Sequence, residues 1–236
     1  MIVVATIFFG LPAVPIGLMP PRGRWLFHWA RWWSRILLAA AGANVRVLHA
    51  ERLRPERAFV IAPNHSSFFD IPVLFSTMPR AIGFLAKRNL FRLPFMGWAM
   101  AAAGFVPVDR GARGRTLATI DAALRRLERG RWLVVFPEET RTRTGELLPF
   151  KGGAALLAIR SGRPILPVGI VGTLSIQRRG GFLITPSRVA VAIGEPIEVE
   201  GRTAADRAEI TSLLRDSVAA LREEAQASLE SSPAAP

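Results

Sequence analysis

The pattern of apolar and polar positions divides the chain near residue 43. Before that point the chain is rich in apolar and aromatic residues, and no acidic residue occurs before Glu51. After it, short apolar runs alternate with stretches in which apolar residues recur every three or four positions. Short apolar runs are typical of buried strands, and apolar residues that recur every three or four positions are typical of helices that pack by one face. Their alternation predicts an α/β domain over residues 44–230, with a frayed tail at 231–236.

The boundaries of the expected elements follow from the same pattern. The helix at 115–129 is the clearest, because Leu117, Ile120, Leu124 and Leu127 fall on one face and a glycine follows. Other helices are expected at 71–77, 153–160 and 204–227. Strands are expected at 45–48, 58–62, 105–108, 132–136, 165–171, 189–193 and 197–200.

The first 43 residues are predicted to anchor the protein to a membrane. Residues 1–21 carry no charged side chain, and about 20 helical residues are enough to cross a bilayer. Because Pro12 and Pro15 would kink such a helix, a single span and a hairpin dipped into one leaflet both stay open. Residues 22–41 interleave four arginines with four tryptophans, a mixture typical of the membrane–water interface. A buried helix pair of a soluble protein is the alternative.

Composition narrows the choice of chemistry. Half of the residues are hydrophobic, which is enough for a buried core, and the formal net charge is +13. The chain has no cysteine and three histidines, so disulfides and thiolate chemistry are excluded and a structural zinc site is not expected. A basic chain attracts nucleic acid, anionic lipid or phosphorylated small molecules. The net charge is the only feature that suggests a nucleic-acid-binding protein. The apolar N-terminus argues against that function, and we expect no nucleic-acid partner.

A histidine and an aspartate directly follow the expected strand at 58–62. His65 could serve as a general base near neutral pH, and Asp70 could orient it by accepting the proton of the other ring nitrogen. In a regular helix, residues five positions apart lie roughly 140° apart around the axis, so the two side chains meet only if the chain turns between them. The alternative is a strand-end histidine beside an aspartate that caps the helix at Pro72.

Further charged residues follow other expected strands. The sequence Phe-Pro-Glu-Glu-Thr-Arg at 136–141 comes after a buried strand, where open α/β sheets bind ligands. Arg141 could grip a phosphate with its fork of donors. Lys151 precedes a helix start, and Arg110 follows the strand at 105–108. For any one of these charges, an ordinary solvated loop is the alternative. Serine-hydrolase, P-loop and dinucleotide-binding motifs do not occur.

Taken in order, these blocks resemble the glycerolipid acyltransferase family, in particular bacterial 1-acyl-sn-glycerol-3-phosphate acyltransferases. The resemblance covers roughly residues 45–200 and rests on His65-x4-Asp70, the Gly…Arg block at 104–110, the block at 136–141, and the Pro-containing apolar strand at 165–170. It implies a mixed central sheet flanked by helices. It also implies acyl transfer from a coenzyme A or acyl carrier protein thioester, as co-substrate, onto a lysophospholipid such as 1-acyl-glycerol-3-phosphate. No metal and no further cofactor are implied. The expected location is the cytoplasmic face of the inner membrane, among membrane lipids.

The resemblance also assigns roles to single residues. His65 would deprotonate the acceptor hydroxyl, and Asp70 would orient His65. The residues that would bind substrate are Lys87, Arg110, Glu138, Arg141 and Lys151, with Arg141 the first choice for the acceptor phosphate.

Glu139 departs from the family pattern, because it stands where the family usually has glycine. Glycine there would permit a positive φ or a close approach of the ligand, whereas a glutamate adds bulk and a negative charge beside an anionic substrate. Two alternatives therefore stay open: an acyltransferase for another lyso-lipid, such as one with an amino-acid headgroup, and a non-catalytic lipid-binding relative.

Overall fold

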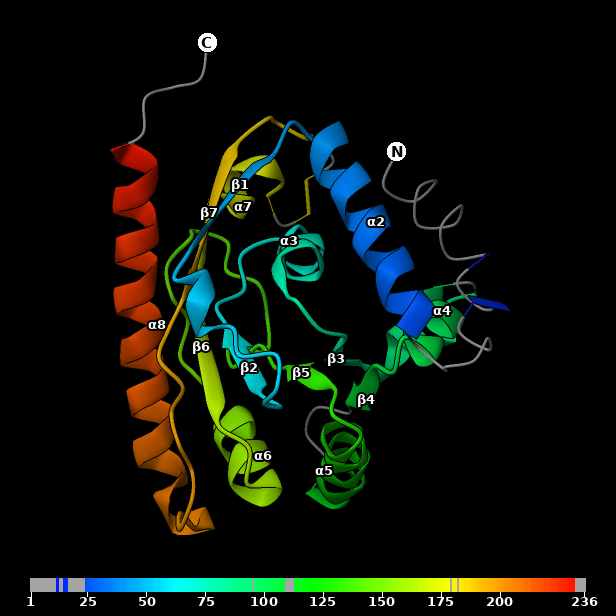
Figure 1. The fold of residues 1–236 in the computed structure, drawn as a ribbon, viewed down its shortest axis with the longest axis vertical. Helices are drawn as coiled ribbons and strands as arrows, with labels where there is room; N and C mark the ends of the chain where they lie inside the picture. Colours follow the sequence, from blue (N-terminus) through cyan, green and yellow to red (C-terminus); the bar gives the residue numbers. More distant parts are fainter. Residues whose placement is uncertain are drawn as a thin grey trace.

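The computed structural model shows an α/β fold built on one mixed sheet of seven strands (Figure 1). It describes residues 12, 15–16, 24–94, 96–108, 113–178, 180–181 and 183–231. The strand order is β1-β7-β6-β2-β5-β3-β4. Five neighbouring strands run parallel, β7 pairs antiparallel with β6, and β1 pairs parallel with β7. The strands are β1 (Asn44–Leu48), β2 (Val60–Pro63), β3 (Ile82–Lys87), β4 (Val106–Val108), β5 (Trp132–Val134), β6 (Ile165–Val171) and β7 (Arg188–Ile193).

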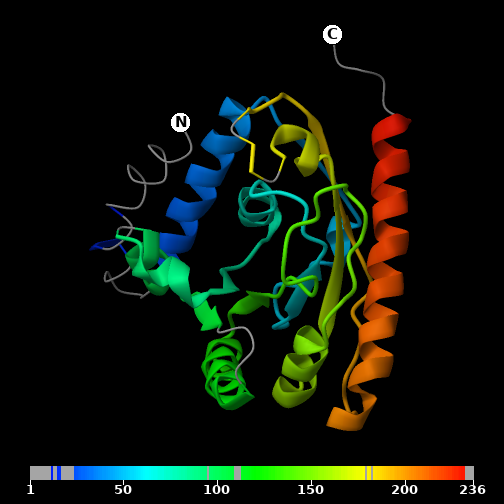
Figure 2. The same cartoon turned by 180° about the vertical axis from the view of Figure 1, so that it is seen from behind.

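Helices cover both faces of the sheet and form a three-layer structure (Figures 1 and 2). One face carries α2 (Arg24–Ala40) and α3 (Asp70–Thr77), which pack on each other. The other carries α5 (Arg113–Glu128), α6 (Gly153–Ser161) and the long α8 (Arg207–Glu230). Shorter helical pieces complete the fold: η1 (Ala50–Arg52), η2 (Arg88–Arg92), α4 (Met96–Ala102), α7 (Thr173–Ile176) and η3 (Ala204–Asp206).

The apolar sequence of the central strands explains why both faces need a covering layer. Successive side chains of a strand point to opposite faces, so Phe59 and Ile61 join the core beneath α2 and α3, whereas Val60 joins the core beneath α5, α6 and α8. Trp132 and Leu133 divide between the two cores in the same way. Strands buried on both faces are expected to read as continuous apolar runs, and these do.

The structure corrects the expected elements at three places. No strand was expected at β3, although it lies in the middle of one half of the sheet between β5 and β4. The strand expected at 197–200 is wrong, because only Ile197 forms an isolated bridge, with Ile165. The expected helix at 204–227 consists of η3 followed by α8.

The N-terminal half of the predicted anchor lies mostly outside the described residues. Its second half is α2, which buries Leu26, Phe27 and Leu37 and leaves Trp25 and Trp32 about half exposed. Within the described parts of the chain, no helix has both the length and the apolar composition needed to cross a bilayer.

Candidate active site

His65 and Asp70 meet in a tight turn between β2 and α3. Nδ1 of His65 lies 2.8 Å from Oδ2 of Asp70. The same carboxylate oxygen accepts hydrogen bonds from the backbone N–H groups of Ser66 (2.7 Å) and Ser67 (2.9 Å). The chain therefore turns around the carboxylate, as the predicted pairing required. The alternative role of Asp70 as a helix cap is wrong, because Phe69 occupies the N-cap and Asp70 is the first residue of α3.

The Asp70 carboxylate is fully buried and supplied with donors on both oxygens. The Thr173 hydroxyl, just beyond the end of β6, donates to Oδ1 at 2.6 Å. A buried carboxylate without partners would be costly, and these hydrogen bonds offset that cost. Because the carboxylate only accepts, Nδ1 of His65 carries the proton and donates it, which leaves Nε2 as the basic nitrogen.

The imidazole of His65 is held in place from its face as well as its edge. Its ring stacks on the Phe136 ring, with centroids 3.8 Å apart and an angle of 18° between the planes. Its side chain is 15% exposed, so one edge of the ring reaches open space. The ring therefore has a fixed orientation and one accessible nitrogen, the arrangement that a general base requires.

Glu138 holds the backbone of His65 rather than facing the cavity. Its Oε1 accepts a hydrogen bond from the N–H of His65 at 2.6 Å, and Oε2 accepts one from the N–H of Leu148 at 2.9 Å. Burial raises the pKa of Glu138 above its ordinary value, while these hydrogen bonds and the charges of His65 and Arg222 oppose the rise. These contacts favour a positioning role for Glu138, and its predicted contact with the acceptor stays a prediction.

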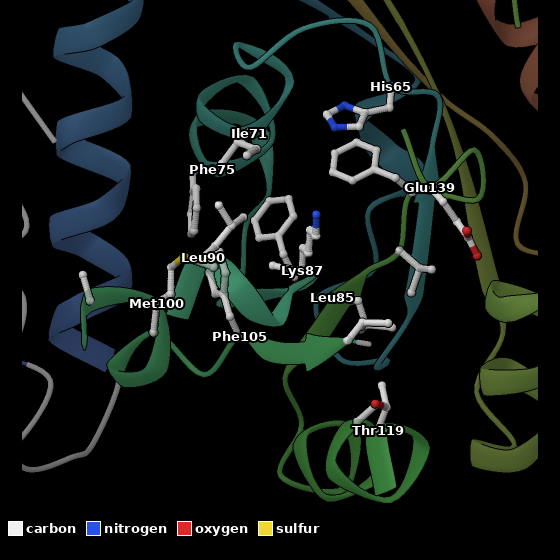
Figure 3. Close-up of a pocket in the computed structure, with 18 of the residues that line it drawn as sticks. His65, Ile71, Phe75, Leu85, Lys87, Leu90, Met100, Phe105, Thr119 and Glu139 are labelled. Atoms are coloured by element: carbon white, nitrogen blue, oxygen red, sulfur yellow. The ribbon is translucent and has the colours of Figure 1, made fainter. Parts of the chain in front are cut away.

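A largely apolar cavity of about 630 Å³ begins at His65 (Figure 3). The cavity is bordered by residues of both helical layers and of the sheet. Its apolar lining comes mainly from α2, α3, β3, α4 and α5, and includes Trp29, Trp33, Phe75, Leu85, Met100, Phe105, Ile120 and Leu157. A cavity of this size and polarity suits a small hydrophobic ligand with one polar end.

The polar residues of the cavity lining include two cations. Lys87 ends β3 and extends toward the part of the cavity that holds His65 (Figure 3). Arg141 lines the same cavity from the loop after β5. The structure thus brings two of the predicted phosphate ligands to the cavity that His65 lines.

Glu139 lines the cavity with an unusual backbone conformation. Its φ is 57°, in the left-handed region that glycine adopts easily and other residues rarely do. The conformation explains why glycine would suit this position, as the family pattern indicates. The Glu139 side chain is exposed, and its carboxylate points away from His65 (Figure 3).

Two predicted site residues remain, Lys151 and Arg110. Lys151 is exposed and does not line the cavity, although its backbone N–H donates to the carbonyl of Pro137 at 2.8 Å. Arg110 lies outside the described residues. Substrate binding by either residue stays a prediction.

Two contributors to the site were missed in the sequence. Thr173 follows the apolar strand β6 as an ordinary polar residue, and only the strand order shows that it reaches Asp70. Thr142 acts through its backbone, because its N–H donates to the carbonyl of His65 at 3.0 Å. The carboxyl ends of parallel strands share one edge of a sheet, and that rule could have suggested Thr173 but not Thr142.

Comparison with known proteins shows which family the chain resembles along most of its length. Residues 44–171 match the family model described as Acyltransferase. The chain is 33% identical over 190 residues to a 1-acyl-sn-glycerol-3-phosphate acyltransferase of Saccharomyces cerevisiae, which covers 79% of this chain and 62% of the yeast protein. It is 29% identical over 188 residues to a protein of that name from Pseudomonas aeruginosa, with 78% and 72% covered. The chain thus spans less than two thirds of the yeast relative's length.

A solved structure shares the fold across nearly the whole chain. The 1-acyl-sn-glycerophosphate acyltransferase PlsC from Thermotoga maritima superposes with a TM-score of 0.81 at 24% sequence identity. The match covers 99% of this chain and 93% of the other. It confirms the expected α/β fold with a mixed central sheet flanked by helices.

Proposed function

Because the chain belongs to the acyltransferase family, we propose that it is a lysophospholipid O-acyltransferase that converts 1-acyl-glycerol-3-phosphate to phosphatidic acid. The observation that carries the proposal is the His65–Asp70 pair at the polar end of a largely apolar cavity. Relatives bearing the name of this activity support the choice of acceptor.

We propose a direct transfer without an acyl-enzyme, with His65 as the general base. Nε2 of His65 takes the proton of the acceptor hydroxyl while the hydroxyl oxygen attacks the thioester carbonyl. The tetrahedral intermediate collapses with cleavage of the carbon–sulfur bond, and the leaving thiolate of coenzyme A or acyl carrier protein takes up the proton from the imidazolium. Asp70 stabilises the imidazolium that forms between these steps and keeps the ring oriented.

The remaining cavity residues fit a lipid acceptor. The ammonium of Lys87 and the guanidinium of Arg141 would bind the acceptor phosphate. The apolar lining would take an acyl chain. The thioester is a co-substrate, and the reaction as written needs no metal or further cofactor.

We also propose that the face formed by α2, η2 and α4 lies on a membrane surface. Large apolar side chains are exposed there, and α2 and α4 also line the cavity, so a lipid acceptor could enter from the bilayer. The cytoplasmic face of the inner membrane, where thioester donors are found, remains the expected location. The exposed apolar residues are Trp25, Trp32, Ile36, Leu90, Leu93 and Trp98.

A test of the reaction compares two histidine variants. Purified protein in mixed micelles with acyl-CoA and 1-acyl-glycerol-3-phosphate should release phosphatidic acid, and His65→Ala should lower kcat by roughly 10²–10⁴ or more. His49→Ala is the matched control, because His49 also contacts an acidic residue, Glu224 at 2.6 Å, but does not line the cavity. Turnover that survives in His65→Ala would overturn the proposed mechanism.

A panel of acceptors tests the substrate. Lysophospholipids with matched acyl chains and different headgroups, one of them an amino acid, are offered to the wild-type protein and products are read by mass spectrometry. Preference for a headgroup other than bare phosphate would overturn the proposed acceptor, and turnover of none would favour a non-catalytic lipid-binding protein.

A further inference from the structure

The long helix α8 packs on β6 and β7, on the far side of the sheet from α3 (Figure 2). The helix approaches β6 closely at Gly169, where an added Cβ would lie 2.7 Å from the carbonyl carbon of Leu221 and 2.8 Å from the nitrogen of Arg222. Only glycine allows this approach without a shift of the backbone. The position of Arg222 relative to β6 is therefore fixed by backbone packing.

The same segment of β6 holds the residue before His65. Ile170 follows Gly169, and its N–H donates to Oδ1 of Asn64 at 2.7 Å. The side-chain amide of Asn64 donates in turn to the Ile170 carbonyl at 2.9 Å. Neighbouring residues of β6 therefore contact α8, at Gly169, and hold the start of the His65 turn, at Ile170.

The side chain of Arg222 reaches the second loop of the site. Its Nη2 donates to the carbonyl of Gly145. The N–H of Gly145 donates to the Thr142 hydroxyl at 3.1 Å, and the N–H of Thr142 donates to the His65 carbonyl at 3.0 Å. An unbroken series of three hydrogen bonds therefore joins Arg222 to the backbone of His65.

Arg222 also acts on the other support of His65 through its charge. Glu138 accepts from the N–H of His65 and from that of Leu148, and both bonds are strongest when the carboxylate is ionised. Burial raises the pKa of Glu138, and the positive charges of Arg222 and, when protonated, His65 lower it. Arg222 therefore helps to keep Glu138 in the form that holds His65.

From these contacts we infer that Arg222 is a positioning residue for acyl transfer, which holds the loop at 138–148 so that His65 stays aligned with Asp70 and with the cavity. The inference rests on the proposed function. Arg222 touches no substrate in this scheme, and it lies beyond residues 44–171, which match the family model.

A polar cavity beside Arg222 offers a way to test its role chemically. The cavity has a volume of about 400 Å³ and is lined by Ser66, Gly145 and Arg222, among others. Removal of the Arg222 side chain would enlarge it by the space of one guanidinium group. A free guanidinium ion could then enter and donate to Gly145 in place of the lost side chain.

The experiment compares Arg222→Ala with Arg215→Ala, an exposed arginine two turns earlier on α8. We expect Arg222→Ala to lower kcat about 10- to 100-fold, since small misplacements of catalytic groups have effects of this size. The KM for acceptor and for acyl-CoA should stay within about twofold of wild type, because substrate contacts are unchanged. Added guanidinium ion should restore part of kcat in Arg222→Ala, an equal concentration of sodium ion should not, and Arg215→Ala should respond to neither.

The outcomes separate this inference from the proposed function. A wild-type protein that acylates no lysophospholipid overturns the proposed function. An active wild type with kcat unchanged in Arg222→Ala overturns the inference alone. If Arg222→Ala unfolds, Arg222→Lys is the second variant, because it keeps the charge and a donor. It should fold, and its kcat should lie between that of the wild type and the about 10- to 100-fold lower value expected when His65 is misplaced. Loss of kcat together with thermal stability in both variants, without rescue by guanidinium, would reduce Arg222 to a packing role and overturn the inference.

Discussion

Replacement of Glu139 by glycine should stabilise the protein, because Glu139 holds a backbone conformation that its own side chain disfavours. Its φ of 57° places it in the left-handed region, which costs a residue with a Cβ roughly 1–2 kcal/mol. Glycine removes this cost but loses about 0.4–1 kcal/mol through the greater freedom of its unfolded chain. The net expectation is a gain of about 1 kcal/mol, or roughly 2–4 °C in Tm for a chain of this size.

Glu139→Ala is the control that separates the backbone from the charge. Alanine removes the carboxylate but keeps the Cβ, so it keeps the strained conformation. Urea unfolding of the three proteins in the same detergent should give Glu139→Gly a larger free energy of unfolding than the wild type or Glu139→Ala. If Glu139→Gly were no more stable than Glu139→Ala, the assignment of backbone strain to residue 139 would be refuted.

Two further predictions concern the carboxylates around His65. Asp70→Asn places an amide where the carboxylate accepts from His65, Ser66 and Ser67, so kcat should fall by about 10⁴ and the free energy of unfolding by about 1–3 kcal/mol. Asp121→Asn, at an exposed position of α5, should change neither, and an active, fully stable Asp70→Asn would contradict this account. For Glu138, burial raises the folded-state pKa above 4.5, so the folded protein binds a proton more readily than the unfolded chain. The stability of wild type relative to Glu138→Gln should therefore be greatest below pH 4.5 and decline as pH rises through the raised pKa, as measured by chemical unfolding at a series of pH values; a difference that grows with pH would contradict the burial.

Apolar patterning was enough to predict most of the sheet. Continuous apolar runs correctly located β2, β5 and β6, because strands buried on both faces leave no polar alternation. β3 was missed because it ends at Lys87, next to Arg88, and these basic residues were interpreted only as a binding block. Residues 197–200 include two apolar side chains, which led to the expected strand, but in the structure only Ile197 pairs, in an isolated bridge with Ile165.

The site was predictable only as far as side-chain chemistry reveals it. His65 and Asp70 follow from their residue types and from the resemblance, and the structure brings them together. The roles of Glu138 and Arg222 could not be predicted, because both work through burial and backbone hydrogen bonds between segments far apart in sequence. A charged residue in a sequence is read by default as solvent-exposed, and Glu138 is 4% exposed.

The two strands at one edge of the sheet set a limit on how the chain can be shortened. β1 pairs with β7, and β7 is in turn paired with β6. A fragment ending at residue 171, where the family match ends, would lose β7 and α8 together. In that fragment β1 would have no neighbouring strand, and the long apolar edge of β6 would be exposed, which makes aggregation easier. The smallest autonomous unit for expression therefore extends to the end of α8, about sixty residues past the recognised motif region.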